Sequence, residues 1–550
     1  MSKSDYVADF SAWSVLANQA SRGLDETRST LFDLAREKAF ATPNNVAFFC
    51  DPAGAVTYGQ IYREACAVAA ALRKMGVERG DVIGMQLPNW KEAVAINLAV
   101  CALGAIINPI PPIFRGAELK ILLKDAGSIV LFVPGCQEKK DRTEMISVVQ
   151  AALPYPLSVV YVRGTTGLTY QKLIDDEEGG KFTPSSVDPR SIKLLLYTSG
   201  TTGKPKGALH THLSMQVWPK IIMREWGLGL GDIMFMPSPV SHVTGYAFGL
   251  ELPFISPVCS ALMDEWSARN ALSYINEVGA TACVGATPFL KELIDEAERA
   301  GDGIDTLKIF ACGGASVAPE LMYKVRQVTK RCHAFRVYGT SEAPMVTRGF
   351  PHVDDVAIAA ETDGKVIGYE VKIADIRSGK VIDMDSGRSG EILVRGDSMM
   401  LGYTGATENV EAYDDDHFFL TGDVGYINDG GGLVITGRKK DIIIRGGENL
   451  SPKEIEDILI SHPDIAEAAV VGMAHPRLGE AVCAFVRVAV GGSAPSVMDL
   501  ARFLECNDLA REKFPERIEY INDFPRTSSG KVMKDLLRDA VNTSLVVCVR

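Results

Sequence analysis

One loop limits the possible folds and functions of this chain more than any other stretch of the sequence. Residues 197–207, YTSGTTGKPKG, contain three glycines, four Ser or Thr hydroxyls and two lysines. The aliphatic residues 192–197 that lead into it are typical of a buried strand. Glycine allows close backbone approach and positive φ, whereas hydroxyl and ammonium groups bind anionic oxygens. The pattern therefore predicts a buried strand that ends in a polyphosphate-binding loop.

This loop differs from a Walker A loop. That motif has a glycine five residues before its Gly-Lys pair, and Ser or Thr after the lysine. Here Thr198 stands five residues before Gly203, and Pro205 follows Lys204. Proline favours extended backbone at the residue before it, so we do not expect a helix to begin at Lys204. The alternative is a polar surface loop without a ligand, because glycine and serine are common in loops.

Length and composition predict a globular protein of several domains. The chain has 550 residues, of which 47% are hydrophobic and 23% charged. The formal net charge is −12 and no long basic run is present, so nucleic acid is not an expected partner.

The cysteines and the apolar segments indicate a cytoplasmic protein without a membrane span. The eleven cysteines include no C-x-x-C pair, as expected of buried thiols in a reducing compartment. The N-terminus lacks the apolar core of a signal peptide. Residues 93–107 are apolar but too short to span, since a bilayer requires about 20 residues. We expect them to form a buried helix that ends at Asn108-Pro109.

Strand-like and helix-like runs alternate along most of the chain. Residues 80–89, 90–105 and 128–134 give the order strand, helix, strand. Such alternation is typical of an α/β fold in which parallel sheets lie between layers of helices. We therefore predict a layered α/β architecture.

The pattern changes near Gly437. Residues 432–459 predict a strand, a charged turn, a strand, a glycine turn and a helix. Ser451 is the expected N-cap of that helix, with Pro452 at its first position and Glu454 completing a capping box. We predict a core domain at 1–437, a hinge at 438–441 and an α+β C-terminal domain at 442–550.

Four further motifs carry chemically useful groups. In YGTSEA the ring of Tyr338 could stack on a base, and Ser341 and Glu342 could offer oxygen ligands to Mg²⁺. In LTGDVG, Asp423 could accept two hydrogen bonds from a ribose diol. TGRKKD lies at the predicted hinge, and PRTSSGKVMK presents Lys531 after a flexible turn. Taken singly, each motif is more typical of an ordinary turn or a solvated lysine than of a binding site.

Together and in this order, the motifs resemble the adenylate-forming superfamily of acyl-CoA synthetases, peptide-synthetase adenylation domains and beetle luciferases. The resemblance covers nearly the whole chain, from residue 56 to residue 534. It implies a large N-terminal domain of layered α/β subdomains and a small mobile α+β C-terminal domain. NPIPPIFRGAEL, residues 108–119, is similar to medium-chain and cyclohexanecarboxylate CoA ligases.

The resemblance implies an ATP-dependent carboxylic acid:CoA ligase. Such an enzyme forms acyl-AMP and pyrophosphate, then transfers the acyl group to the thiol of CoA, with Mg²⁺ assisting. Lys531 would bridge the substrate carboxylate and the α-phosphate, and Ser341 and Glu342 would assist the metal. The other residues implied at the nucleotide are Thr198, Ser199, Gly200, Thr201, Thr202, Gly203 and Lys206 for phosphates, Gly313, Gly314, Ala315, Tyr338, Gly339 and Thr340 around adenine, and Asp423 and Arg438 for ribose.

The resemblance also implies a domain that swings about Lys440 between the two half-reactions. One face of that domain supplies Lys531, and the other supplies the turn containing Gly446 and Gly447, which would let the pantetheine arm of CoA pass close to the backbone. The alternative for this turn is a tight connection between two strands.

Three histidines are further candidates. His242 is implied to line the acyl pocket and to act as a gate, although a lone histidine is often only structural. His210 and His212 have a spacing that could suit zinc, but the sequence shows no third ligand.

Two other functions stay open at this point. A free-standing adenylation enzyme would load the acid onto a carrier-protein thiol, and a nucleotide-binding regulator or luciferase-like oxygenase would lack the thiol step. The small and apolar residues expected at the acyl pocket favour a medium-chain, alicyclic or aromatic acid over acetate. The protein is expected to be a monomer or a homodimer.

Overall fold

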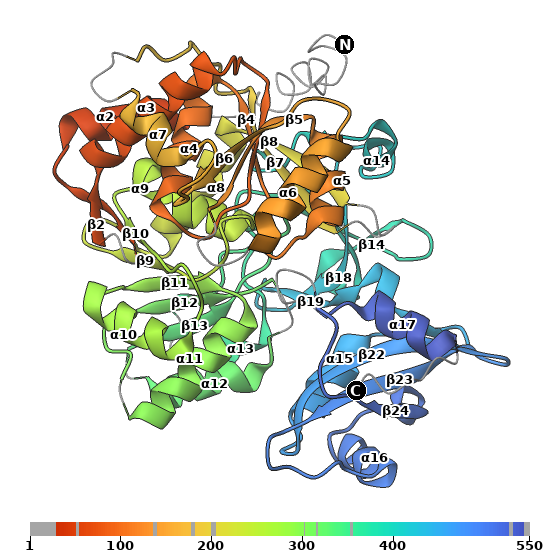
Figure 1. Ribbon diagram of the computed structural model, residues 1–550. Helices are drawn as coiled ribbons and strands as arrows, with labels where there is room; N and C mark the ends of the chain where they lie inside the picture. The colour runs from red at the N-terminus through yellow and green to blue at the C-terminus, as the bar shows by residue number, and fades with distance from the viewer. Residues whose placement is uncertain are drawn as a thin grey trace.

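The protein has a mixed α/β structure with a large N-terminal domain and a small C-terminal domain, as predicted (Figure 1). The computed structural model describes residues 29–50, 54–135, 140–177, 182–199, 205–301, 303–314, 317–329, 331–352, 356–526 and 532–543.

One seven-stranded sheet carries the strand that leads to the glycine-rich loop. Its order is β17-β8-β7-β4-β3-β5-β6. The five strands from β7 to β6 are parallel to their neighbours, whereas β8 and β17 are antiparallel additions at one edge. The bounds are β3 (Val82–Met85), β4 (Ile106–Pro109), β5 (Ser128–Pro134), β6 (Ser158–Val162), β7 (Ile192–Ser199), β8 (Pro205–Thr211) and β17 (Gly402–Tyr403).

A second seven-stranded sheet has the order β13-β12-β11-β9-β10-β1-β2. All its pairs are parallel except β1 with β2. The bounds are β1 (Val46–Cys50), β2 (Gly54–Thr57), β9 (Ile233–Met236), β10 (Cys259–Leu262), β11 (Ala282–Gly285), β12 (Ile309–Cys312) and β13 (His333–Arg336).

Helices cover both sheets, which explains why their strands are almost continuously apolar. The helices of the large domain are α2 (Leu31–Ala41), α3 (Tyr58–Lys74), α4 (Lys91–Leu103), α5 (Gly116–Ala126), α6 (Lys140–Ala152), α7 (Tyr170–Asp175), α8 (His212–Glu225), the π-helix η2 (Gly245–Glu251), α9 (Leu252–Ile255), α10 (Ala268–Val278), α11 (Thr287–Ala300), α12 (Pro319–Val328), α13 (Val356–Glu361), the short η3 (Met384–Ser386) and α14 (Ala406–Val410).

A third sheet is antiparallel and was not predicted. Its order is β15-β14-β16-β18-β19, and a separate apolar cluster packs against it. Short strands with little helix between them gave no alternating signal in this region. The bounds are β14 (Glu370–Ala374), β15 (Val381–Ile382), β16 (Gly390–Arg395), β18 (Phe419–Ile427) and β19 (Leu433–Arg438).

The C-terminal domain, blue in Figure 1, has its own sheet and core. The sheet has the order β21-β20-β23-β22, with β24 also paired to β23. Strands, turns and helix follow in the predicted sequence. The elements are η4 (Lys439–Asp441), β20 (Ile443–Arg445), β21 (Glu448–Leu450), α15 (Pro452–Ile460), β22 (Ile465–His475), β23 (Gly479–Val488), α16 (Val497–Cys506), η5 (Arg511–Lys513), β24 (Arg517–Tyr520) and α17 (Lys534–Asn542).

Two local predictions were wrong. The apolar segment 93–107 is not one helix, because α4 ends at Leu103 and Gly104 takes a left-handed φ of 70°. A buried strand, β4, then begins at Ile106. A fully buried strand and a buried helix are equally apolar, so composition did not reveal the boundary.

The predicted capping box at α15 was also wrong. Ser451 is the N-cap and Pro452 begins the helix, but the Ser451 side chain makes no capping bond. Its hydroxyl instead donates to the carbonyl of Thr436 in β19, and Glu454 pairs with Lys513 at 2.6 Å. The serine therefore links the first helix of the C-terminal domain to the large domain.

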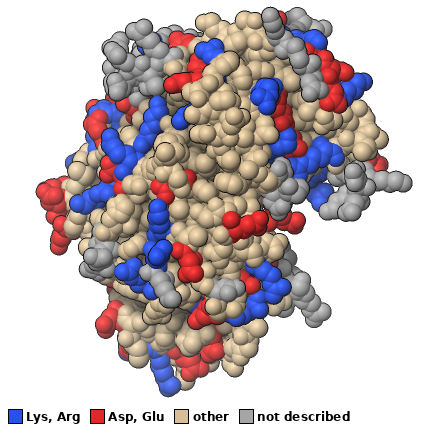
Figure 2. All heavy atoms as spheres, turned by 90° about the vertical axis from the view of Figure 1, so that its left-hand side faces the viewer, with Lys and Arg blue, Asp and Glu red and all other residues tan. Residues whose placement is uncertain are grey.

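Lys and Arg side chains are interspersed with Asp and Glu over the face in Figure 2, where no extended patch has a single sign. In the described part of the chain, no helix is both long enough and apolar enough to cross a bilayer. The cysteines in this part are all free thiols. Burial raises the pKa of several, to about 12 for Cys312, which keeps them protonated.

A buried ion pair joins the second and third sheets. Arg336, at the end of β13, donates to both oxygens of Asp363, at 2.8 and 2.7 Å from Nη2. Arg336 also donates to the carbonyl of Ala360 at 2.8 Å, and Asp363 accepts a bond from the backbone of Ile435 in β19 at 2.8 Å. Removing either partner would leave an uncompensated buried charge.

We predict that Arg336→Ala lowers the free energy of unfolding by about 3–5 kcal/mol, because Asp363 would lose its buried counter-charge. Urea denaturation followed by fluorescence measures this. Arg36→Ala, which removes an exposed pair with Asp33, is the control and should change stability little. Equal stability of the two variants would contradict the prediction.

Candidate functional site

The predicted site residues follow strands of both parallel sheets. Thr198 lies at the carboxyl end of β7, Gly313 directly follows β12, and Tyr338 follows β13. Ligands of open parallel sheets bind at the carboxyl ends of the strands. The fold therefore directs these residues to the edges where a ligand is expected.

The described flanks of the glycine-rich loop are paired strands. Thr198 in β7 lies opposite Lys206 in β8. The Thr198 hydroxyl donates to Oε1 of Glu342 at 3.1 Å. This bond connects the loop predicted to hold phosphates with the carboxylate predicted to hold the metal. Gly200, Thr201, Thr202 and Gly203, and the side chain of Ser199, lie outside the described residues.

A buried histidine supports Ser341, the second predicted metal ligand. Nε2 of His210 donates to the backbone carbonyl of Ser341 at 2.7 Å. Burial lowers the pKa of His210 to about 4, so its ring is neutral near pH 7. Burial also lowers the pKa of His212, and no group of the described chain bonds either of its ring nitrogens. Among the residues that the structure describes, no three His, Cys, Asp or Glu side chains are grouped as a metal site.

The carboxylate of Asp423 is shared between two predicted nucleotide contacts. Asp423 is only 4% exposed and pairs directly with Arg438 across β18 and β19. Oδ1 lies 2.9 Å from Arg438 Nε, and Oδ2 accepts a bond from the Tyr338 hydroxyl at 2.8 Å. Burial and the nearby Asp423 charge raise the pKa of Tyr338, so its hydroxyl stays a donor. Each oxygen keeps a lone pair for a ribose hydroxyl.

The backbone around Tyr338 is held tightly. Its N–H donates to Thr347 Oγ1 at 2.8 Å. A Cβ on Gly313 would lie 2.5 Å from the carbonyl of Val337, so the GGA segment and the residue before Tyr338 are in close contact. Gly314 has a φ of 80°, which favours glycine. Ala315 lies outside the described residues.

The YGTSEA turn is closed by its own residues. Thr340 and Ala343 exchange two bonds of 3.0 Å, from the Thr340 N–H to the Ala343 carbonyl and from the Ala343 N–H to the Thr340 hydroxyl. A Cβ on Gly339 would lie 2.4 Å from the backbone nitrogen of Met345. The turn that presents Glu342 is thus compact and leaves no space for a larger residue at Gly339.

The predicted hinge lies at a short 3₁₀ turn, η4. Lys440 pairs with Asp535 of α17 at 2.9 Å, and Arg538 of α17 pairs with Asp441 at 3.0 Å. These pairs attach the hinge to the helix that follows Lys531 in the sequence. Lys531 itself lies outside the described residues.

Gly446 and Gly447 form the two-residue turn of the β20–β21 hairpin, with φ of 59° and 94°. Both need a left-handed backbone, which explains the glycines without any ligand. The large domain touches this turn through Arg377, which donates to the carbonyl of Gly447 and, at 3.2 Å, to Oδ1 of Asn449. Sequence reasoning missed Arg377, since an exposed hairpin arginine has no distinguishing pattern.

His242 precedes η2 and is partly exposed. Its Nδ1 accepts a bond from the N–H of Thr244 at 3.4 Å, and its carbonyl accepts one from Tyr246 at 2.8 Å. Phe248, later in η2, is fully buried against Trp218, with a ring separation of 5.0 Å. The partly exposed His242 therefore lies just before a π-helix whose residues are all buried.

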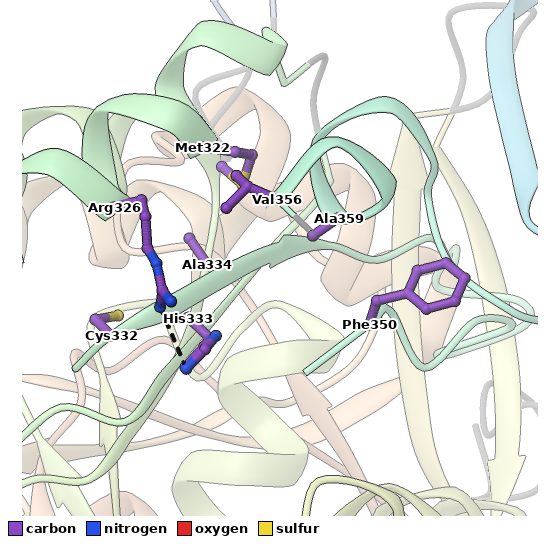
Figure 3. A pocket seen from close by; sticks show the side chains of 8 residues that line it. All are labelled: Met322, Arg326, Cys332, His333, Ala334, Phe350, Val356 and Ala359. Atoms are coloured by element: carbon purple, nitrogen blue, oxygen red, sulfur yellow. Dashed lines mark hydrogen bonds between the residues drawn. The ribbon is translucent and has the colours of Figure 1, made fainter. Parts of the chain in front are cut away.

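A separate small pocket lies between α12, β13 and α13 (Figure 3). It contains none of the predicted site residues, so we place the candidate site at the sheet edges instead. Its lining consists of Met322, Arg326, Cys332, His333, Ala334, Phe350, Val356 and Ala359.

The structure adds Tyr403 to the candidate site, although no sequence motif indicated this residue. Its hydroxyl donates to Glu342 at 2.9 Å, and its ring lies 5.2 Å from the Lys206 ammonium. The contact with Glu342 spans 61 residues of sequence, and no local pattern marks it.

Comparison with known families agrees with this arrangement. The model of the AMP-binding enzyme family matches residues 35–404, and that of the AMP-binding enzyme C-terminal domain matches residues 454–531. The chain belongs to the AMP-binding enzyme family. It is an enzyme of the AMP-forming acid–thiol ligase group, as the motif order predicted.

Individual relatives of this family cover most of the chain. A medium-chain fatty-acid–CoA ligase of Escherichia coli is 32% identical over 521 residues, 93% of this chain and 90% of the relative. A fatty acid–[acyl-carrier-protein] ligase, ScoC of Streptomyces coeruleorubidus, is 29% identical over 505 residues, 90% of this chain and 93% of the relative. The ATP-bound crystal structure of an RpMatB-BxBclM chimera has a TM-score of 0.82 at 25% identity, covering 93% of this chain and 98% of the chimera.

We predict that Asp423→Asn weakens ATP binding by about 10–100-fold, because hydrogen bonds to a charged group contribute about 1.5–3 kcal/mol. Calorimetric titration with ATP measures the Kd. Asp416→Asn, at an exposed carboxylate that pairs with Lys372, is the matched control and should leave the Kd unchanged. An unchanged Kd for Asp423→Asn would remove this residue from the nucleotide site.

Proposed function

We propose that the protein is an ATP-dependent carboxylic acid:CoA ligase. It activates a medium-chain, alicyclic or aromatic acid as acyl-AMP and transfers the acyl group to CoA. The proposal rests on two clusters of bonded side chains in a member of the AMP-binding enzyme family. One cluster is Thr198 with Glu342, and the other is Asp423 with Tyr338 and Arg438.

Repulsion between anions is the main barrier to the first half-reaction. The acid carboxylate must approach the α-phosphorus of ATP, and both groups are negative. A lysine between them favours the transition state over the separated reactants, and we assign this role to Lys531. Lys206 and the loop hydroxyls would bind the β- and γ-phosphates and then the leaving pyrophosphate. Tyr338, with Gly313 opposite, would enclose adenine.

The residues present fit a magnesium ion. Glu342 offers a carboxylate oxygen, and the hydroxyl of Ser341 is a second hard ligand on the same compact turn. When bound, Mg²⁺ would neutralise charge on the phosphate oxygens. Glu342 and Ser341 would orient the phosphates relative to Lys206, which approaches from β8.

CoA would enter in a second arrangement of the domains. We propose that the C-terminal domain, residues 442–550, turns about the hinge 438–441 after pyrophosphate leaves. In that arrangement the Gly446-Gly447 turn would replace Lys531 beside the acyl-AMP, and His242 would open the path of the thiol. The pairs that Lys440 and Asp441 make with α17 connect the hinge to the lysine-bearing segment, which supports coupled movement of the two.

A carrier-protein thiol is the second candidate acceptor. The relative ScoC is named for an acyl-carrier-protein acceptor and covers nearly the same length of chain. The two acceptors are distinguished by supplying CoA or a panel of carrier proteins to the preformed adenylate. We also propose a cytoplasmic location, which the free cysteines favour.

We predict that pyrophosphate is released when medium-chain, alicyclic or aromatic acids are supplied with ATP, and that AMP turnover increases when CoA is added. Formation of the adenylate needs only the acid and ATP, whereas release of AMP from the adenylate needs a thiol. A coupled pyrophosphate assay over a panel of acids, with and without CoA, measures both steps. No pyrophosphate release with any acid would reject the ligase proposal.

We predict that Lys531→Ala reduces adenylation by at least about a hundredfold while a supplied acyl-AMP is still converted to acyl-CoA. The lysine would stabilise charge only in the first step. Single-turnover measurements of each half-reaction separate the effects. Lys513→Ala, which removes a pair with the exposed Glu454 elsewhere in the C-terminal domain, is the matched control. Equal loss of both half-reactions in Lys531→Ala would contradict domain alternation.

A further inference from the structure

Tyr403 lies on the same face of a sheet as Thr198 and Lys206, two residues of the proposed phosphate-binding site. In the strand register, Thr198 is opposite Lys206, and Ala208 is opposite Tyr403. Side chains two residues apart in a strand share a face, so Lys206 and Ala208 point the same way. Thr198, Lys206 and Tyr403 therefore lie together across the neighbouring strands β7, β8 and β17.

The hydroxyl of Tyr403 completes the bonding of one carboxylate oxygen. It donates to Oε1 of Glu342 at 2.9 Å, and Thr198 donates to the same oxygen at 3.1 Å. A carboxylate oxygen has two lone pairs, so these two donors satisfy Oε1. Within the described residues, Oε2 has no hydrogen-bond partner. The carboxylate is thus oriented with one oxygen held by protein and the other available.

The ring of Tyr403 acts on Lys206. The ammonium lies 5.2 Å from the ring centroid, a distance at which the π face attracts a cation. No ion pair joins Lys206 and Glu342 in the described structure, although both contact Tyr403. The ring gives the ammonium a partner other than the carboxylate and so keeps the two charges from neutralising each other.

Tyr403 is itself held in place. Asn409 accepts a bond from its N–H at 2.7 Å and donates to its carbonyl at 2.8 Å. The residue is only 6% exposed. A residue fixed at backbone and side chain can define the position of both neighbours.

We propose that Tyr403 is a positioning residue for the metal–phosphate site. Together with Thr198, its hydroxyl holds Oε1 of Glu342, which leaves Oε2 available to Mg²⁺. Its ring gives the Lys206 ammonium a partner other than Glu342, so the ammonium stays available to the phosphates. This inference rests on the proposed function, in which Glu342 binds Mg²⁺ and Lys206 binds ATP.

Tyr403→Phe tests the hydroxyl while retaining the ring. We expect the Mg²⁺ concentration for half-maximal pyrophosphate release to rise by about tenfold, as is typical when a partner of a metal ligand is removed. Calorimetric binding of ATP should weaken by a similar factor at limiting Mg²⁺ and stay unchanged in EDTA. Saturating Mg²⁺ should restore activity, because the ligand itself is still present.

Tyr403→Leu tests the ring, since it also removes the π face. Here ATP binding in EDTA should weaken as well, because Lys206 is free to pair with Glu342. Tyr170→Phe is the matched control. Like Tyr403, Tyr170 is buried and donates its hydroxyl to a glutamate, to Oε1 of Glu64 at 2.8 Å, but it lies in α7, which carries none of the proposed site residues. It should show the Mg²⁺ dependence of the unaltered protein.

Two results would overturn the inference. One is an unchanged Mg²⁺ requirement in Tyr403→Phe, and the other is an equal loss of ATP affinity with and without Mg²⁺, which would indicate a general packing defect. The binding measurement needs no acid or CoA. If the unaltered protein bound ATP in a Mg²⁺-dependent way but released no pyrophosphate with any acid, the ligase proposal would fail without affecting this test.

Discussion

The Asp423 carboxylate is the point on which the nucleotide side of the structure depends. One of its oxygens pairs with Arg438 and the other accepts the Tyr338 hydroxyl, so it joins the end of the second parallel sheet to the antiparallel third sheet. The Arg438 side chain is 46% exposed, so the ion pair alone holds these groups only weakly, whereas the bond from Tyr338 to the same carboxylate is buried. The adenine and ribose sides of the proposed site are therefore positioned by one carboxylate.

Much of the fold could be predicted because its signals are local. Strand β5 has the predicted bounds 128–134, β7 begins at the predicted residue, and the order of elements from β19 to α15 follows the glycines and the proline in the sequence. The predictions that were wrong concern contacts distant in sequence or a boundary inside a uniform run. The Ser451 hydroxyl bonds Thr436 rather than its own helix, and the boundary between α4 and β4 lies within one apolar segment.

The residues of the candidate site also fall into two classes, those that a local motif predicts and those that only the folded structure reveals. Glycine, hydroxyl and acidic motifs identified Thr198, Glu342 and Asp423, because the residue types themselves suggest phosphate, metal and ribose. Tyr403 and Arg377 act only through partners brought near by the fold, so their roles could not be derived from their own segments. A buried tyrosine in a strand is usually a core residue, and only the contacts with Glu342 and Lys206 distinguish this one.

Strand β8 explains why the phosphate and metal sides of the site are positioned together. Lys206 lies near its start, His210 near its end supports the Ser341 carbonyl, and Tyr403 is held beside it by the pairing of β17. The proposed phosphate cation is therefore part of β8, and both proposed metal ligands are held by side chains of β8 or of the strand paired with it. One strand thus fixes the phosphate side of the proposed site relative to its metal side.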